Sequence, residues 1–198
     1  MNEMTDLTEL NSYFCKQVSL HLRRRAEGKV SSVNDLVHII LDPTQKGGQN
    51  ASWERIDKIA ELSLTKAPSA VDALIEVASQ EKYWQSSWAV GQAAILALGM
   101  IKDARAAKPL LGMLESNKNM PLGIIYALIW SLGEIRDSSA VKPLIDKLRR
   151  ESRLKLEMGK NYFGSERLIV EALRKLSGTD FGNDLQKWEE WYKTSHGM

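Results

Sequence analysis

Apolar residues recur along this chain at helical spacing. They fall three and four positions apart over residues 5–27, and again over residues 32–41. This spacing places apolar side chains on one face of an amphipathic helix, so it predicts a helix in each stretch. Gly28 is expected to end the first helix and Pro43 to stop the second. The polar, glycine-containing stretch 44–50 then predicts a loop.

From residue 52 onward the pattern predicts pairs of helices, and part of it repeats. When residues 94–111 are moved forward by 34 positions, most of their distinctive residue types coincide with those of residues 128–145. A partial copy precedes them at an offset of 36. A fixed period of this length indicates stacked helical hairpins that bury a common core. The matched residues are Leu98-Gly99 with Leu132-Gly133, Ile101 with Ile135, Asp103 with Asp137, Ala106 with Ala140, and Lys108-Pro109-Leu110 with Lys142-Pro143-Leu144.

The repeated residues have structural interpretations. Asp103 and Asp137 precede the second helix of their copies, where a carboxylate accepts hydrogen bonds from free backbone amides and favours the helix dipole. We therefore interpret them as caps. Pro109 and Pro143 are expected to bend or interrupt the second helices. Small residues at the ends of the first helices allow close helix packing, and these are Ala97, Gly99, Ser131 and Gly133.

The repeat changes after the fourth copy, whose second helix is expected to end at about Arg150. The next first-type helix, 166–177, aligns only at an offset of 41, which implies an insertion over residues 153–165. We expect an extended connection there. Such insertions lie on one face of a solenoid and often bind partners, although a longer turn without a role explains the offset as well. A last helix is expected to cover the final repeat with Leu185, Trp188, Trp191 and Tyr192.

Two strings of the chain resemble the HEAT repeat superfamily, and most closely the short HEAT-like repeats first described in phycobilisome lyases. They are residues 97–111 and residues 131–145, with a similar tail at 177–191. Tetratricopeptide repeats share the period, but their Leu-Gly lies inside the first helix, whereas here it closes that helix. The resemblance implies an all-α, right-handed α-α superhelix, a HEAT/armadillo-like solenoid of about four to five helix pairs with capping helices at both ends.

The length of 198 residues suits one domain. We expect N-terminal capping helices over 1–50, HEAT-like repeats over 51–177 and a C-terminal capping helix over 178–198. The single cysteine, Cys15, fits a reducing compartment, and the acidic N-terminus lacks the features of a signal peptide. The sequence also lacks a long uncharged apolar stretch. It therefore predicts a cytoplasmic protein with no membrane partner.

No arrangement of residues in the sequence indicates catalysis, a cofactor or a metal. The iron-dependent hydroxylases built on HEAT repeats use His-Glu pairs, but none of His21, His38 and His196 is followed by glutamate. His38 lies among apolar residues and is expected in the core. We therefore predict that the chain is not an enzyme.

The resemblance implies a scaffold that binds another protein through a curved helical surface. The charged residues that come one position after the buried stripe form columns across the repeats, and the insertion adds further polar and aromatic residues. The predicted partner-binding residues are Asp72, Glu76, Lys108, Lys142, Asp146, Arg149, Arg153, Tyr162 and Phe163. The sequence does not predict the identity of the partner or the oligomeric state.

Two other functions fit less well. Nucleic-acid binding is suggested by the nine basic and five acidic side chains in residues 101–150, and by aromatic residues near the insertion that stack on bases in such proteins. The net charge of the chain is only +2, however, and nucleic-acid binders usually carry a stronger imbalance. The resemblance also allows a bilin lyase or chaperone, but a shared repeat does not establish an activity.

Overall fold

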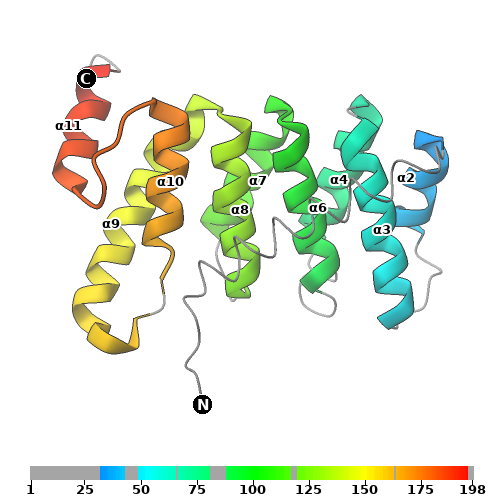
Figure 1. Cartoon of the computed structure of the whole chain (residues 1–198), viewed down its shortest axis with the longest axis horizontal. Helices are drawn as coiled ribbons and strands as arrows, with labels where there is room; N and C mark the ends of the chain where they lie inside the picture. Colours follow the sequence, from blue (N-terminus) through cyan, green and yellow to red (C-terminus); the bar gives the residue numbers. More distant parts are fainter. Residues whose placement is uncertain are drawn as a thin grey trace.

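The computed structural model describes residues 32–42, 49–65, 67–80, 88–116, 120–162 and 164–195 (Figure 1). This part of the chain is helical apart from short connections. The helix expected over residues 5–27 and the residue Phe163 lie outside it. Its α-helices are α2 (Val33–Leu41), α3 (Gln49–Thr65), α4 (Pro68–Ser79), α6 (Trp88–Ile101), α7 (Ala107–Ser116), α8 (Leu122–Ile135), α9 (Val141–Met158), α10 (Glu166–Ser177) and α11 (Leu185–Ser195).

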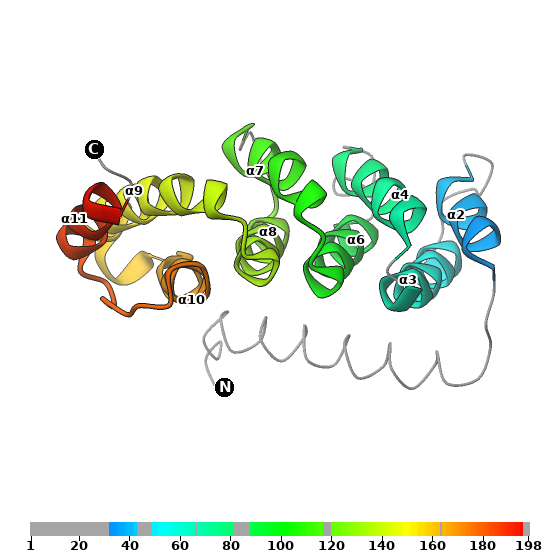
Figure 2. The same cartoon turned by 90° about the horizontal axis from the view of Figure 1, so that it is seen from above.

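The helices form two layers, which Figure 2 shows from above. One layer contains α3, α6, α8 and α10 in order, and each of these helices packs on the next. The other layer contains α2, α4, α7 and α9. The chain alternates between the layers as it advances, which is the arrangement of a helical solenoid. The predicted all-helical solenoid is therefore confirmed, while the right-handed superhelix and the number of repeats stay predictions.

The core lies between the two layers and coincides with the predicted apolar stripe. Leu74, Leu110 and Leu144, at equivalent positions of α4, α7 and α9, are completely buried. Each belongs to one continuous cluster of buried side chains that extends from α2 to α11. Because a single helix pair cannot cover its own stripe, the stack holds each unit folded.

Each repeated aspartate of the two best copies caps a short 3₁₀ turn that precedes the second helix. Asp103 Oδ1 accepts a hydrogen bond from the Arg105 backbone amide at 2.9 Å, and Asp137 Oδ1 accepts one from Ser139 at 2.9 Å. The pKa of both carboxyls lies below its usual range. The cause is the hydrogen bonds that each carboxylate accepts from the side chain and the backbone amide of the residue two positions later. The prediction that these residues are caps is confirmed.

The 3₁₀ turns also correct the prediction for the prolines. The turns occupy Ala104–Ala106 and Ser138–Ala140, so α7 begins at Ala107 and α9 at Val141. Pro109 and Pro143 are thus the third residues of their helices, where a proline is tolerated. They mark the first helical turn and do not bend or interrupt the helix interior.

Glycines near the ends of the first-layer helices bring those helices into close contact, as predicted. A Cβ atom added to Gly133 would lie 2.9 Å from both Cα and Cβ of Ala172 in α10. One added to Gly99 would lie 2.8 Å from Cα of Ser131 in α8. A real Cβ atom does not pack this close to another carbon atom, so only glycine permits this spacing of the helices.

The first part of the insertion, to Asn161, is helical, which corrects the prediction of an extended connection. Helix α9 does not end at about Arg150 but continues to Met158, and a 3₁₀ turn then covers Gly159–Asn161. We call residues 151–158 the α9 extension. It contains no glycine or proline and is rich in Arg, Lys, Leu and Glu, which favour helix. Gly159, at φ 55°, ends it because few other residues adopt that conformation.

Two smaller predictions are also wrong. The loop expected over residues 44–50 ends earlier, because α3 already begins at Gln49. His38 is exposed and not in the core, because Leu36 and Ile40 form the buried face of the short helix α2.

The last helix covers the end of the stack, as predicted. Trp188 of α11 is completely buried, and its Nε1 donates a hydrogen bond to the Gly182 carbonyl at 2.9 Å. The rings of Phe181 and Trp191 pack against Trp188 edge to face. Helix α11 lies against α9, so the final second-layer helix is shielded on one side.

Candidate docking groove between α7 and α9

A groove lies between the end of α7 and the middle of α9, in the second layer. Its volume is about 540 Å³. Four predicted partner-binding residues come together here, namely Lys142, Asp146, Arg149 and Arg153. We call this site the α7–α9 groove. Its complete lining is Leu114, Glu115, Lys142, Pro143, Asp146, Arg149, Arg150 and Arg153.

Two of the groove cations are held by carboxylates. Lys142 Nζ donates to Asp146 Oδ1 at 2.6 Å, and Arg149 Nη1 donates to the same oxygen at 2.6 Å. Arg149 Nε also donates to Oε1 of Glu189 in α11 at 3.0 Å. Partial burial opposes ionisation of Asp146, but the bonds from Lys142 and Arg149 outweigh it and lower the pKa of the carboxyl. These two cations therefore fix the groove wall and dock α11.

The other two groove cations are not used in this way. Arg150 and Arg153 are exposed, and neither forms an ion pair with another residue of the described ranges. In the first layer, by contrast, Lys102 and Lys175 both contact Glu134, at 2.6 and 2.8 Å. The guanidinium groups of Arg150 and Arg153 consequently keep their hydrogen-bond donors available to a ligand in the groove.

The α9 extension carries apolar side chains into solvent beside this groove. Leu154 is 43 % exposed, Leu156 is 87 % exposed and Met158 is 50 % exposed. Leu154 comes four positions after Arg150 and Leu156 three after Arg153, so each leucine neighbours an arginine on the helix surface. Leu154 and Leu156 are two positions apart on the helix and therefore lie on different sides of it, each beside one of the two arginines.

A buried polar cluster fixes the base of the extension. Glu151 accepts hydrogen bonds from the Tyr162 hydroxyl at 2.6 Å and from the Ser165 hydroxyl at 3.0 Å. Lys147 Nζ lies 3.2 Å from the same carboxylate. Burial opposes ionisation of Glu151, but these partners outweigh it and lower its pKa. Burial and the Glu151 charge raise the pKa of Tyr162.

A second contact lies one turn further along the extension. Lys155 Nζ donates to Oε2 of Glu166, the first residue of α10, at 2.6 Å. Ser152 donates to the other oxygen of Glu166 at 3.3 Å. The extension is therefore tied to α10 on one side, and its exposed leucines lie elsewhere on its surface.

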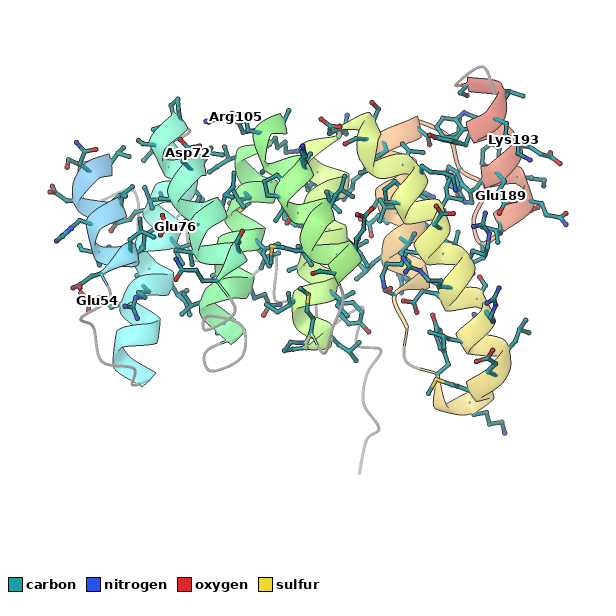
Figure 3. All side chains as sticks on the ribbon, turned by 180° about the vertical axis from the view of Figure 1, so that it is seen from behind. Glu54, Asp72, Glu76, Arg105, Glu189 and Lys193 are labelled. Atoms are coloured by element: carbon teal, nitrogen blue, oxygen red, sulfur yellow. The ribbon has the colours of Figure 1, made fainter. Side chains whose placement is uncertain are left out.

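The remaining predicted residues lie away from the groove. Asp72 and Glu76 are exposed on α4, where Glu76 accepts a hydrogen bond from Gln80 at 3.1 Å. Arg105 reaches across to Asp72 at 3.0 Å, as the labelled side chains in Figure 3 show. Lys108 is exposed on α7 outside the groove lining. Tyr162 belongs to the buried cluster, and the partner-binding role of these residues stays a prediction.

Leu154 and Leu156 were missed by reasoning from the sequence, and Arg150 was considered only as part of a basic cluster for nucleic-acid binding. The repeat period placed the end of the second helix at Arg150, so the residues beyond it were assigned to a connection. The available signal was local: between Pro143 and Gly159 the chain contains no further proline or glycine to interrupt a helix. A continuous helix would have placed Arg150, Leu154 and Leu156 on neighbouring turns.

The layers and the groove define a helical repeat protein with a candidate binding surface on its second-layer helices. The family model of the PBS lyase HEAT-like repeat matches residues 124–150, within α8 and the first part of α9. The chain therefore contains a HEAT-like repeat at these residues. No curated protein and no solved structure matches it. The match stops at residue 150, so the α9 extension lies beyond the family repeat.

Two further findings concern only the part of the chain that the structure describes. None of its helices is both long and apolar enough to cross a membrane. No three of its His, Cys, Asp or Glu side chains are grouped closely enough to hold a metal ion.

Proposed function

We propose that this chain is a non-catalytic scaffold that binds another protein, and that the partner docks in the α7–α9 groove. HEAT-like repeats generally serve protein interaction, which supports the class of function. The observation that carries the position is the groove itself, where two arginines without an ion pair in the described ranges lie beside exposed leucines of the α9 extension. Arginine is enriched among residues that dominate binding energy, and exposed apolar patches mark interaction sites.

The test is affinity capture from the native lysate with three forms of the full chain. The groove variant is Arg150→Glu/Arg153→Glu. The matched control is Lys187→Glu/Lys193→Glu, which reverses two exposed cations outside the groove lining (Lys193 is labelled in Figure 3). We expect one or more proteins that the wild type and the control retain and the groove variant loses. Equal capture by all three forms would contradict docking in the groove.

Nucleic-acid binding is an outcome that the same experiment separates. Nuclease treatment before capture leaves a direct protein partner bound but removes one held through nucleic acid. The exposed leucines beside the groove favour a protein partner, because a phosphate backbone has no apolar side chains to place on them. We therefore expect capture to resist nuclease treatment.

A bilin lyase or chaperone is the second candidate function, and only the description of the matching family favours it. Its test is direct, because a bilin held by a protein changes its visible absorption. An unchanged spectrum after mixing the full chain with a bilin would remove this candidate.

A further inference from the structure

We infer that the segment docking in the α7–α9 groove is acidic and also carries apolar side chains. This inference rests on the proposed docking site and adds the chemistry of the partner. Two observations support it, namely the charge left unmatched in the groove and the order of residues along α9.

The charge of the groove lining favours an anionic ligand. The groove lining contains four cations and two carboxylates. The Asp146 carboxylate already forms ion pairs with Lys142 and Arg149. Arg150 and Arg153 remain, one helical turn apart, with no partner in the described ranges. Arginine guanidinium groups pair with carboxylates in a planar, two-bond geometry. A segment with two or more Asp or Glu side chains therefore matches this pair.

The apolar part of the segment is set by the residues further along α9. Helix α7 ends at Ser116, and Leu114 and Glu115 at its end line the groove. Beyond them, α9 continues as the extension, where Leu154 follows Arg150 by four positions and the almost fully exposed Leu156 follows Arg153 by three. A chain that pairs with either arginine therefore lies next to an exposed leucine, and covering that leucine removes apolar surface from water.

The same features distinguish the segment from other anionic ligands. A nucleic-acid backbone has no apolar side chains to place beside Leu154 and Leu156. A membrane surface is flat on this scale and does not enter a groove between two helices. A protein segment supplies both the carboxylates and the apolar contacts.

The experiment is a selection of short random peptides displayed on phage against the immobilised full chain. Peptides that also bind the Arg150→Glu/Arg153→Glu variant are removed at each round. We expect the enriched peptides to carry net negative charge together with Leu, Ile, Phe or Met. Their affinity for the groove variant should fall about tenfold, since two exposed ion pairs are lost and replaced by repulsion. The Lys187→Glu/Lys193→Glu control should bind them as the wild type does.

Two further variants complete the test. Leu154→Ser/Leu156→Ser should weaken the same peptides, and a peptide with its Glu residues changed to Lys should prefer the groove variant over the wild type. Far-ultraviolet circular dichroism verifies that each variant is folded.

The outcomes separate the inference from the proposed function. Enriched peptides that require Arg150 and Arg153 but carry no net negative charge would overturn the inference and leave the docking site in place. If no peptide depends on the two arginines, or if the groove variant instead loses the ability to shift a DNA duplex in a gel at low salt, both the inference and the proposed function fail.

Discussion

Helices α7 and α9 begin alike and end differently. Both come after a 3₁₀ turn capped by an aspartate, and both carry a proline as their third residue. Helix α7 then ends after 10 residues, whereas α9 continues for 18. The shared part supplies the buried stripe, and the extension supplies exposed leucines, an exposed arginine and the polar cluster. The comparison shows that residues shared between repeats build the solenoid, while the unshared extension adds exposed side chains beside the groove.

The largest effect is expected when a leucine is replaced by alanine in the shared part of α9, compared with the same replacement in the extension. Leu144→Ala removes a completely buried side chain of the shared stripe and should lower the free energy of unfolding by about 2–5 kcal/mol. Leu156→Ala in the extension should change it by less than about 0.5 kcal/mol, because that side chain is exposed. Urea unfolding followed by circular dichroism measures both. A similar loss for the two variants would remove the distinction between shared and unshared residues.

A smaller effect is expected at the repeated glycine of α8. Gly133→Ala places a Cβ 2.9 Å from the backbone of Ala172 and should destabilise the fold by about 1–3 kcal/mol. Gly112→Ala in α7 is the matched control, since no atom lies within 4 Å of its added Cβ. The control should gain up to about 1 kcal/mol from its higher helix propensity. Thermal melts of the two variants should therefore shift in opposite directions, and a stabilised Gly133→Ala would disprove the close approach.

The smallest of these effects concerns the polar cluster that fixes the extension. The folded-state pKa of Glu151 lies below its unfolded value, so its stabilising contribution is present above the unfolded pKa and is lost as pH falls through the folded one. Glu151→Gln should reduce the loss of unfolding free energy on acidification by about 1 kcal/mol. Unfolding free energies at neutral pH and at pH values below the ordinary glutamate pKa give the comparison. Wild type should lose more stability on acidification than the variant, and parallel curves would contradict this role.

The fold was predictable because its determinants recur. Asp103 and Asp137, or Gly99 and Gly133, have the same role in each copy, so comparing the copies identified caps and close contacts without a structure. The extension was not predictable from the same comparison, because a period describes only residues that are repeated. Its helix depends on local propensity, and its anchor depends on Glu151 meeting Tyr162 and Ser165 from the far side of a turn.

The groove was predictable only in part, for a related reason. The residues one position after each buried residue of the stripe are predicted to face outward. Lys142 and Asp146 are two of them, and both line the groove. The same rule also selected Asp72, Glu76 and Lys108, since spacing along one helix does not reveal where the neighbouring helix lies. The groove is formed by residues of two separate helices, α7 and α9, so its position depends on their three-dimensional packing.

The central claim is that a partner docks in the α7–α9 groove and reaches the neighbouring α9 extension. Photo-crosslinking tests it most directly, with a photoreactive residue placed at Leu156 in one form and at Leu64 of α3 in another. Both side chains are exposed, so neither replacement disturbs the core. The account predicts a discrete crosslinked protein partner from position 156 and none from position 64. A crosslink from position 64 with none from position 156 would contradict it.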